Sequence, residues 1–367
     1  MSKSLRHILL CLCLALLATA GFVSCDVHEF PDGGEGTGET TDFILHLDYT
    51  DALKWGFNTE IDYSFNRAPS LTDSVKPQDA PDIDVRYIVK AYRVADDGTV
   101  ASEPSTVVTE AGTDTTQLNR SMKLQLAPGA YKILVWTDYV EHGTLADLYY
   151  DPTDFKEVTY RDREGYTGNN DLRQAFRGEV DAVVHAATDA VTNSATAIMQ
   201  RPLAKFKFVS TDLEKFLAMV VMSRAGRAAP PMTASELEVA MSKINFSDFK
   251  IRFIYTGFLP CAFNVWTNRP CDSWTGITFD SGMKAISETD TELGHDLVLV
   301  NGHGSSVAVR LEVYDRDGTL LSSTNPIDVP LLRNKLTIVR GNFLTSKASG
   351  GVGVVTDFDG EYNYEVP

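Results

Sequence analysis

The stretch that decides the fold is Leu124-Gln125-Leu126-Ala127-Pro128-Gly129-Ala130-Tyr131-Lys132-Ile133-Leu134-Val135-Trp136. Apolar residues alternate with polar or small ones before its proline-glycine pair, a pattern that buries one face of a strand and wets the other. The pair itself is typical of a turn. After the turn, Tyr131, Ile133 and Val135 fall on one face of an extended chain. Leu134 and Trp136 fall on the other face. The stretch therefore predicts two strands that flank a turn.

Similar runs recur along the chain and predict a mainly β protein. They cover residues 43–49, 85–94, 176–184, 203–209, 249–258 and 307–314. Asp-Gly pairs, which accept the positive φ of a tight turn, follow the second and the last of these runs. Strands at this spacing, separated by turn signals, favour β-sandwich domains.

Helix is expected in one short region, between Thr211 and Met241. Thr211-Asp212-Leu213-Glu214 and Thr233-Ala234-Ser235-Glu236 both have the Thr-x-x-Glu spacing of a capping box. Pro230-Pro231 lies between them and breaks a continuous helix. We predict two short helices as an excursion within a β domain.

The N-terminus has the pattern of a signal peptide. Lys3 and Arg6 precede an uncharged run that ends at Ser24-Cys25. A cysteine directly after a small residue resembles the lipobox of bacterial lipoproteins, which implies lipidation of Cys25. Ordinary cleavage nearby and an unprocessed anchor are the alternatives. Residues 26–42 are rich in glycine, threonine and acids and predict a flexible tether.

Charge excludes a nucleic-acid partner. Without residues 1–24 the chain keeps 31 basic and 50 acidic residues, a net charge of −19, and no basic stripe interrupts this acidity. The remaining length suits two domains. We place a signal peptide at 1–24, a tether at 25–41, an N-terminal sandwich at 42–200 and a C-terminal sandwich at 201–367.

Two cysteines lie in the body of the chain, Cys261 and Cys271. Export permits a disulfide between them, which would contribute about 2–3 kcal/mol in an unstrained geometry. A reduced, buried pair is the equal alternative. A zinc site needs further ligands, and none is near in the sequence.

No catalytic, metal or cofactor site is predicted. Asp315-Arg316-Asp317-Gly318 begins like a calcium loop, but Pro326 stands where that loop needs a glutamate. The acidic loops around 147–154 and 167–171 could hold a hard cation, although acidic loops are common on an acidic protein. Trp266 and Trp274 flank the cysteines among turn residues and are candidates for an exposed, sugar-binding platform.

Several segments resemble the fimbrillin-like lipoproteins of Bacteroidales, and in particular a family of unassigned function grouped with fimbrial anchor and accessory subunits. The similar segments are 130–141, 166–178, 201–208, 255–260 and 329–341. The stretch quoted above also looks like the turn and strand of transthyretin-like sandwiches. This resemblance implies two transthyretin-like domains, export as a lipoprotein and donor-strand exchange with other fimbrial subunits.

Two further features bear on strand exchange. The glycine-led segment 350–367, with partial alternation of apolar residues, could be donated to another subunit or could pair within its own sheet. Stalk subunits of the resembled family are cut after an arginine, and Arg67 is the first arginine after Cys25. An anchor is expected to keep the segment that such a cut would release.

The sequence thus predicts a non-enzymatic lipoprotein of the outer membrane, exposed on the cell surface and held there by its acylated cysteine. We expect a fimbrial anchor or accessory subunit with other fimbrial subunits as partners. A glycan-binding surface lipoprotein is the alternative.

Overall fold

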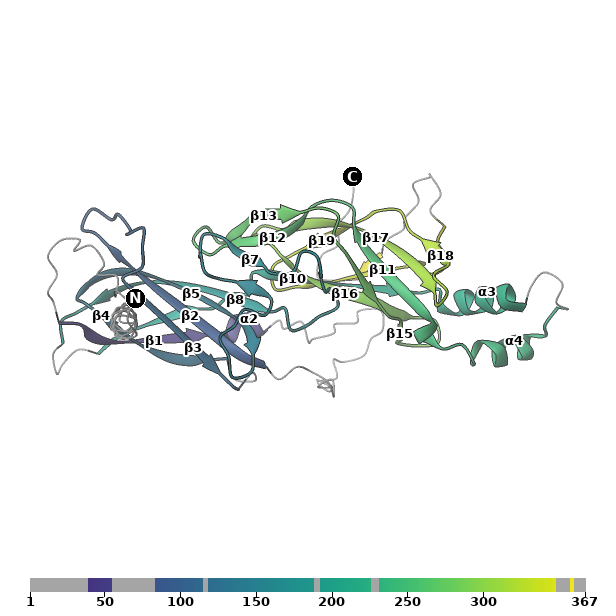
Figure 1. Cartoon of the computed structure of the whole chain (residues 1–367), viewed down its shortest axis with the longest axis horizontal. Coiled ribbons are helices and arrows are strands. Elements are labelled where there is room, and N and C mark those ends of the chain that lie inside the picture. The colour runs from purple at the N-terminus through teal and green to yellow at the C-terminus, as the bar shows by residue number, and fades with distance from the viewer. Residues whose placement is uncertain are drawn as a thin grey trace, which may run out of the picture. The chain divides into compact units, whose positions relative to one another are not determined.

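The computed structural model describes residues 39–54, 83–114, 118–187, 192–225, 231–347 and 357–359. They belong to one compact unit that begins at Thr40. This unit is mainly β, as predicted, and its strands form five sheets (Figure 1). The signal peptide, Cys25, most of the tether and Arg67 lie outside the described residues.

The first half of the unit contains two sheets around one core. Its elements are β1 (Thr41–Asp48), α2 (Thr50–Lys54), β2 (Ile83–Val94), β3 (Thr106–Gly112), β4 (Arg120–Leu126), β5 (Gly129–Glu141), β8 (Ala175–Val184) and β9 (Asn193–Ile198). One sheet has the order β4-β1-β9, and the other has the order β3-β2-β5-β8. Apolar side chains of both sheets meet in one cluster.

The second half has a larger sheet with the same kind of central strand. Its strands are β10 (Leu203–Ser210), β11 (Phe249–Tyr255), β12 (Leu259–Asn264), β13 (Arg269–Trp274), β14 (Thr278–Ser281), β15 (Lys284–Ala285), β16 (Thr291–Leu299), β17 (Ser305–Asp315), β18 (Leu320–Ser323), β19 (Ile327–Leu331), β20 (Leu336–Gly341) and β21 (Asp357–Asp359). The sheet β15-β16-β10-β20-β21 contains the same central motif as β4-β1-β9: an antiparallel neighbour on one side and a parallel one on the other.

A further sheet of this half has the order β14-β11-β17-β18. In it β11 lies between β14 and β17, and β17 also pairs with β19. Phe253 and Phe279 stack at 4.6 Å on the inner side of the β11–β14 pair. The second core is therefore rich in aromatic side chains.

Strand β5 joins the two cores, and the residues predicted to share each of its faces do so. Tyr131, Ile133 and Val135 are buried in the core of the first half. Leu134 and Trp136 are buried in the core that continues into the second half. One strand thus contributes to both cores because successive side chains point to opposite faces.

The predicted turn before β5 has a different role from that of a hairpin. β4 pairs with β1, whereas β5 pairs with β2 and β8, so the turn carries the chain from one sheet to the other. Gly129 has a φ of +145°, and a Cβ there would lie 2.9 Å from Arg93 Nη2. Glycine is favoured at this corner because L side chains rarely adopt this backbone conformation, whereas the end of the flexible Arg93 side chain could move aside.

Two short strands of the range 42–200 pair with the second half. β6 (Tyr150–Asp151) and β7 (Val158–Tyr160) extend the β13-β12 hairpin into a four-stranded sheet. Phe155, between them, accepts the backbone hydrogen bond of Val265 at 2.8 Å. The segment that follows β5 therefore ties the two halves together.

The helical excursion lies where it was predicted, as α3 (Leu213–Ala225) and α4 (Ala234–Met241), which project side by side beyond the sheets (Figure 1). Thr233 and Glu236 form the expected capping box. The capping box predicted at Thr211 is wrong, because the Thr211 hydroxyl donates to Asn342 Oδ1 at 3.1 Å instead. No helix among the described residues is long and apolar enough to cross a bilayer.

Candidate functional site: strand β1 and the contacts that hold it

Strand β1 is the central strand of its sheet although it lies at the start of the compact unit. It pairs antiparallel with β4 from Thr41↔Leu126 to Leu47↔Arg120. It pairs in parallel with β9 from Phe43↔Asn193 to Asp48↔Ile198. Removal of β1 would leave an unpaired edge on each of these neighbours. We call the space between β4 and β9 the β1 slot.

One face of β1 fills the slot with apolar side chains. Phe43 and Leu45 are fully buried and Leu47 is 2% exposed, whereas on the other face Asp42 and His46 are exposed and Ile44 is half-buried. Burial of a leucine or phenylalanine side chain contributes about 1.5–3 kcal/mol. Three such side chains and two ladders of hydrogen bonds hold the strand.

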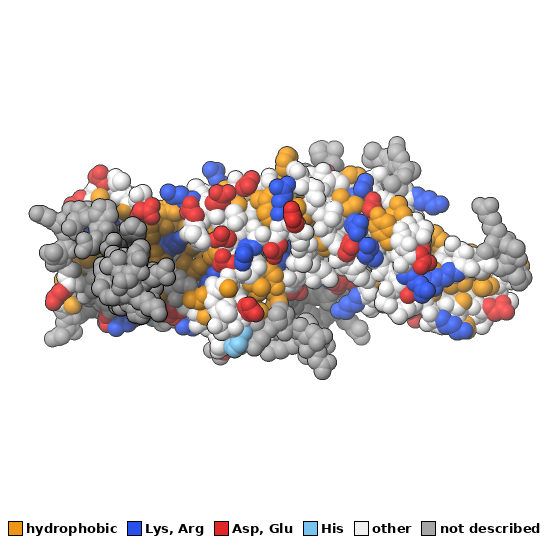
Figure 2. Space-filling view, in the orientation of Figure 1, with side chains coloured by type: hydrophobic (Ala, Val, Ile, Leu, Met, Phe, Trp, Pro, Cys, Tyr) orange, Lys and Arg blue, Asp and Glu red, His pale blue; other side chains and the backbone are white. Residues whose placement is uncertain are grey.

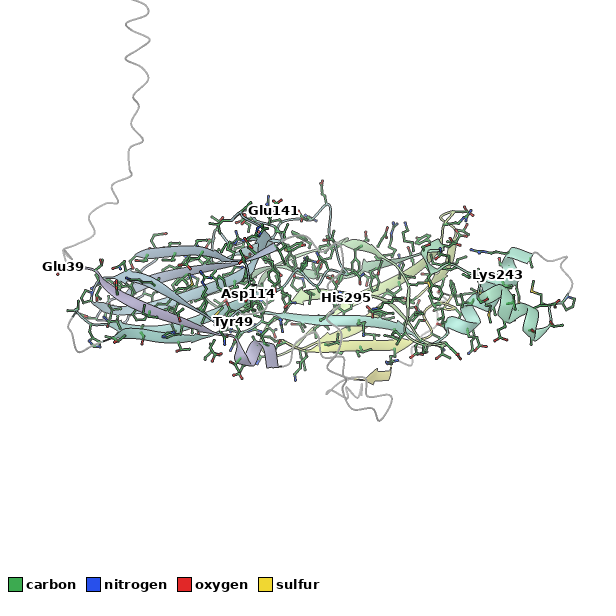
Figure 3. The ribbon with its side chains drawn as sticks, turned by 90° about the horizontal axis from the view of Figure 1, so that it is seen from below. Glu39, Tyr49, Asp114, Glu141, Lys243 and His295 are labelled. Atoms are coloured by element: carbon green, nitrogen blue, oxygen red, sulfur yellow. The ribbon has the colours of Figure 1, made fainter. Side chains whose placement is uncertain are left out.

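Tyr49 fixes the end of β1 (Figure 3). Its amide donates to Asn119 Oδ1 at 2.8 Å, and its hydroxyl lies 2.6 Å from Thr137 Oγ1. The ring meets Phe176 edge to face at 5.1 Å. Burial raises the pKa of the Tyr49 phenol well above its ordinary value. The strand is thus anchored at the point where the chain turns into α2.

Arg201, in the connection between β9 and β10, contacts α2. Its Nη1 donates to the carbonyl of Ala52 at 3.0 Å and to Asn334 Oδ1. Its Nη2 donates to Gln174 Oε1 at 2.9 Å, and the guanidinium lies 5.0 Å from the ring centre of Phe176. Only 3% of Arg201 is exposed, and burial lowers its pKa to about 10.

Asn334 completes this contact from the turn between β19 and β20. It has a φ of +59°, a left-handed conformation that asparagine adopts more readily than most residues. Its backbone amide donates to the carbonyl of Leu203 at 2.7 Å, and its Nδ2 lies 3.5 Å from the carbonyl of Asp51. Side chains of the second half thus hold the backbone that follows β1.

A second buried polar cluster ties the segment 166–178 to β16. Asp296 is fully buried and accepts hydrogen bonds from the hydroxyls of Tyr166 at 2.7 Å and Tyr255 at 2.6 Å. Arg173 lies 3.5 Å from the same carboxylate and over the Tyr160 ring at 4.2 Å. Burial raises the pKa of Asp296, against the opposing effect of the Arg173 charge. The cluster satisfies its own charges, which fits a structural role.

The neighbouring His295 lies between two carboxylates. Its Nε2 is 3.2 Å from Asp171 Oδ1 and its Nδ1 is 3.7 Å from Glu292 Oε1. Lys205 pairs with the same Asp171 at 2.7 Å, and Lys207 lies 3.8 Å from Glu292. Burial acts to lower the pKa of His295, but the two carboxylates outweigh it and raise the pKa above its usual value. Alternating charges neutralise the cluster.

Two of the carboxylates that the sequence offered for a cation have other partners. Asp171, in one of the acidic loops, is taken up by Lys205 and His295. Asp315 accepts the amides of Asp317 and Thr319 and so closes its own turn. Among the residues that the structure describes, no group of three or more His, Cys, Asp or Glu side chains could hold a metal ion. Charged side chains of both signs are interspersed on the face drawn in Figure 2.

Cys261 and Cys271 are free thiols in the structure. They lie in the two strands of the β12–β13 hairpin, where the register shifts between Pro260 and Phe263. Cys261 is buried in the core and burial raises its pKa to about 12, whereas Cys271 is exposed. The thiols are therefore neither bridged nor buried as a pair.

Trp266 and Trp274 do not form a single platform. Trp266 lies in the turn of the β12–β13 hairpin and Trp274 at its open end, about 17 Å apart along a six-residue strand. Both are half-buried: Trp266 packs edge-on against Tyr92 at 4.5 Å, and Trp274 lies 6.2 Å from Tyr160. Each tryptophan extends the core outward.

The family model described as a family of unknown function (DUF6562) matches residues 22–367 of this chain. The chain belongs to this family. No curated protein matches it significantly. The prediction of a family of unassigned function is therefore confirmed.

Several solved structures are similar to the chain at low identity. The fimbrial anchor protein Mfa2 from Porphyromonas gingivalis is 9% identical, with 82% of this chain and 91% of that chain covered and a TM-score of 0.37. A fimbrial assembly protein from Parabacteroides distasonis is 9% identical, with coverages of 82% and 90% and a TM-score of 0.34. A protein provisionally described as a cell adhesion protein, from Bacteroides eggerthii, is 13% identical, with coverages of 89% and 96% and a TM-score of 0.42. At these TM-scores the similarities assign neither a fold nor a function to this chain.

Sequence reasoning did not find Arg201, Asn334 or Asp296 as site residues. The first two lie in the segments 201–208 and 329–341, which carry part of the family resemblance. Their partners, among them the backbone carbonyls of Ala52 and Asp51, lie far away in the chain, and no spacing rule reveals such contacts. An arginine next to a strand with no carboxylate nearby in sequence is the one signal that could have drawn attention to Arg201.

Proposed function

We propose that this chain is a non-enzymatic surface lipoprotein, a fimbrial anchor or accessory subunit, that assembles with other subunits by β-strand complementation. In this proposal β1 is the strand with which the subunit completes its own sheet. The acylated Cys25 holds the chain to the outer membrane. The two halves are transthyretin-like sandwich domains.

The observation that carries the proposal is the position of β1. A strand at the start of the compact unit occupies the centre of a sheet, with only one face buried. An open pair of strand edges offers unpaired backbone groups to an incoming strand, whose alternating side chains then fill the vacated pockets. The exposed sites on β1 are polar, so the strand can leave without carrying a fully apolar surface into water.

Arg67 distinguishes two forms of the function. It lies in sequence between α2 and β2, so a cut after it would separate β1 from the rest of the chain. An anchor keeps this bond intact and retains both β1 and the lipid. A stalk subunit is cut there and accepts a strand from a neighbour.

The C-terminal segment is the candidate donor, and part of it already pairs with its own subunit. Asp357–Asp359 forms β21, which pairs antiparallel with β20 from Ile338↔Asp359 to Arg340↔Asp357. This is a short contact at the edge of a sheet. Donation to a second subunit would require these three residue pairs to separate first.

Mass spectrometry and native gels of the protein from its own cell envelope test the proposal. An acyl group on Cys25, an intact Arg67–Ala68 bond and a ladder of co-purifying subunits are expected for an anchor. A cut bond within a ladder indicates a stalk role. An unacylated protein that runs as a monomer would contradict the proposal.

A further inference from the structure

Two side chains of the second half contact adjacent backbone carbonyls of α2. Arg201 Nη1 donates to the carbonyl of Ala52 at 3.0 Å, and Asn334 Nδ2 lies 3.5 Å from the carbonyl of Asp51. Ala52 itself is 3% exposed and packs in the core of the first half. We infer that Arg201 and Asn334 form a latch on α2 that keeps β1 in its slot after the chain is cut between α2 and β2. This inference rests on the strand exchange proposed above.

The latch is assembled from parts that do not leave with β1. Gln174 precedes β8, Phe176 lies in β8, and Asn334 lies between β19 and β20. All three contact the Arg201 guanidinium and fix its orientation. The Arg201 side chain is therefore positioned before α2 docks, so little side-chain entropy is lost when the bond to α2 forms.

Release of α2 would break the bond that Arg201 Nη1 donates to the carbonyl of Ala52. Arg201 is 3% exposed while α2 is docked, so this bond is shielded from water as long as β1 stays in its slot. Hydrogen bonds from charged groups are worth more than neutral ones, so its loss opposes departure of α2. The latch consequently slows departure of β1 without touching the strand itself.

Retention of β1 decides which role the subunit plays. A cut subunit that holds its own β1 keeps both edges of the slot occupied and accepts no foreign strand. A cut subunit that loses β1 exposes β4 and β9 together. The strength of the latch therefore sets whether proteolysis converts this protein into an acceptor.

The test uses the full chain with the recognition sequence of a site-specific protease inserted between Arg67 and Ala68. After cleavage, a labelled synthetic peptide of residues 41–54 is added in excess, and its entry measures how fast the N-terminal fragment leaves. We expect Arg201→Met to speed this exchange by at least about tenfold, because it removes the bond to Ala52.

Arg333→Met is the matched control. Arg333 is half-buried; it donates to Asn268 and to the carbonyl of Val300 and lies 5.7 Å from the Phe263 ring. Burial lowers its pKa to about 10, as for Arg201. None of these contacts involves β1 or α2. We expect Arg333→Met to reduce stability but to leave the exchange rate within about twofold of the parent, since the bonds of its side chain go to Asn268 and Val300 and not to Arg201, Asn334 or α2.

Asn334→Gly tests the other residue of the latch while preserving the turn between β19 and β20. Glycine tolerates a φ of +59° at least as well as asparagine, so the turn can form without the amide side chain. Faster exchange in both Arg201→Met and Asn334→Gly supports the latch. The latch is overturned if Asn334→Gly and Arg201→Met exchange as slowly as the parent. It is also overturned if Arg333→Met exchanges as fast as these two variants.

Failure of the latch and failure of strand complementation give different results. The latch is read from exchange of the 41–54 peptide, which needs no second subunit. Complementation is read from capture of a labelled 350–367 peptide by the cut chain. If the cut chain captures the 350–367 peptide but the latch variants exchange the 41–54 peptide at the parent rate, only the latch is excluded. If the latch variants exchange faster but the 350–367 peptide is not captured, only the proposed donor is excluded.

Discussion

Strands β1 and β10 occupy the same place in the two halves but are buried to very different extents. Each is central, with an antiparallel neighbour on one side and a parallel neighbour on the other. β1 alternates buried and exposed residues, whereas all eight residues of β10 are buried. In the proposed strand exchange, the strand with one buried face is the one that leaves, and the strand with two buried faces stays in the core.

The outer face of β10 is covered by charges rather than by apolar groups. Lys205 and Lys207 are 7% and 6% exposed and pair with Asp171 and Glu292. Burial acts to raise the pKa of Asp171, but contacts with His295 and Lys205 outweigh it and hold that pKa well below its usual range. The second half has thus sealed the face that the first half leaves open.

Replacing a buried phenylalanine in each strand gives the largest expected effect. Phe43 in β1 and Phe206 in β10 are both fully buried. Phe206→Ala and Phe43→Ala should each lower the free energy of unfolding by about 3–5 kcal/mol, measured by urea denaturation. Hydrogen exchange should separate them: Phe43→Ala quickens exchange in β1, β4 and β9, while β16 stays protected. Equal loss of protection in both sheets would mean that β1 is not separable.

The buried carboxylate of β16 should matter almost as much. Asp296→Ala leaves Arg173 buried without its partner and two tyrosine hydroxyls without an acceptor. The expected loss is about 3–5 kcal/mol of unfolding free energy, because an uncompensated buried charge remains. The control Asp280→Ala breaks an exposed pair with Arg252 and should cost less than about 1 kcal/mol. A small effect at Asp296 would argue against a rigid connection between the halves.

The charged face of β10 should make stability depend on pH. The pKa of His295 is raised in the folded state above its ordinary 6.5. Its contribution is therefore complete below pH 6.5 and is lost as pH rises through the raised value. His295→Gln should accordingly cost more stability at pH 5.5 than at pH 9, compared by thermal unfolding. Asp171, Glu292, Lys205 and Lys207 face the ring, so the comparison is made above the range in which the carboxylates titrate.

The open face of β1 should tolerate change best. His46 is exposed, and its Nδ1 lies 2.8 Å from the hydroxyl of Ser121 on the neighbouring strand. His46→Ala should alter unfolding free energy by no more than about 0.5 kcal/mol, as expected for a surface substitution. A large loss in the same denaturation assay would show that this face is covered by something in solution.

Much of the secondary structure was predictable because it depends on local pattern. The alternation in β5 correctly placed Tyr131, Ile133 and Val135 opposite Leu134 and Trp136. The Thr233 capping box was predicted correctly from a spacing of three residues. Thr211 has the same spacing, but its hydroxyl found Asn342 from the far end of the chain, and no local rule anticipates that competitor.

The sequence by itself determined the elements: the β-rich composition, the two-faced β5, the helical excursion and the glycine corner at Gly129. These follow from periodicity and backbone preference, which act over a few residues. Only the tertiary structure decided that β1 fills a central slot, that β7 joins the sheet of the second half and that Arg201 reaches Ala52. Those arrangements depend on contacts between residues more than 70 positions apart, whose energies arise only after the sheets have packed.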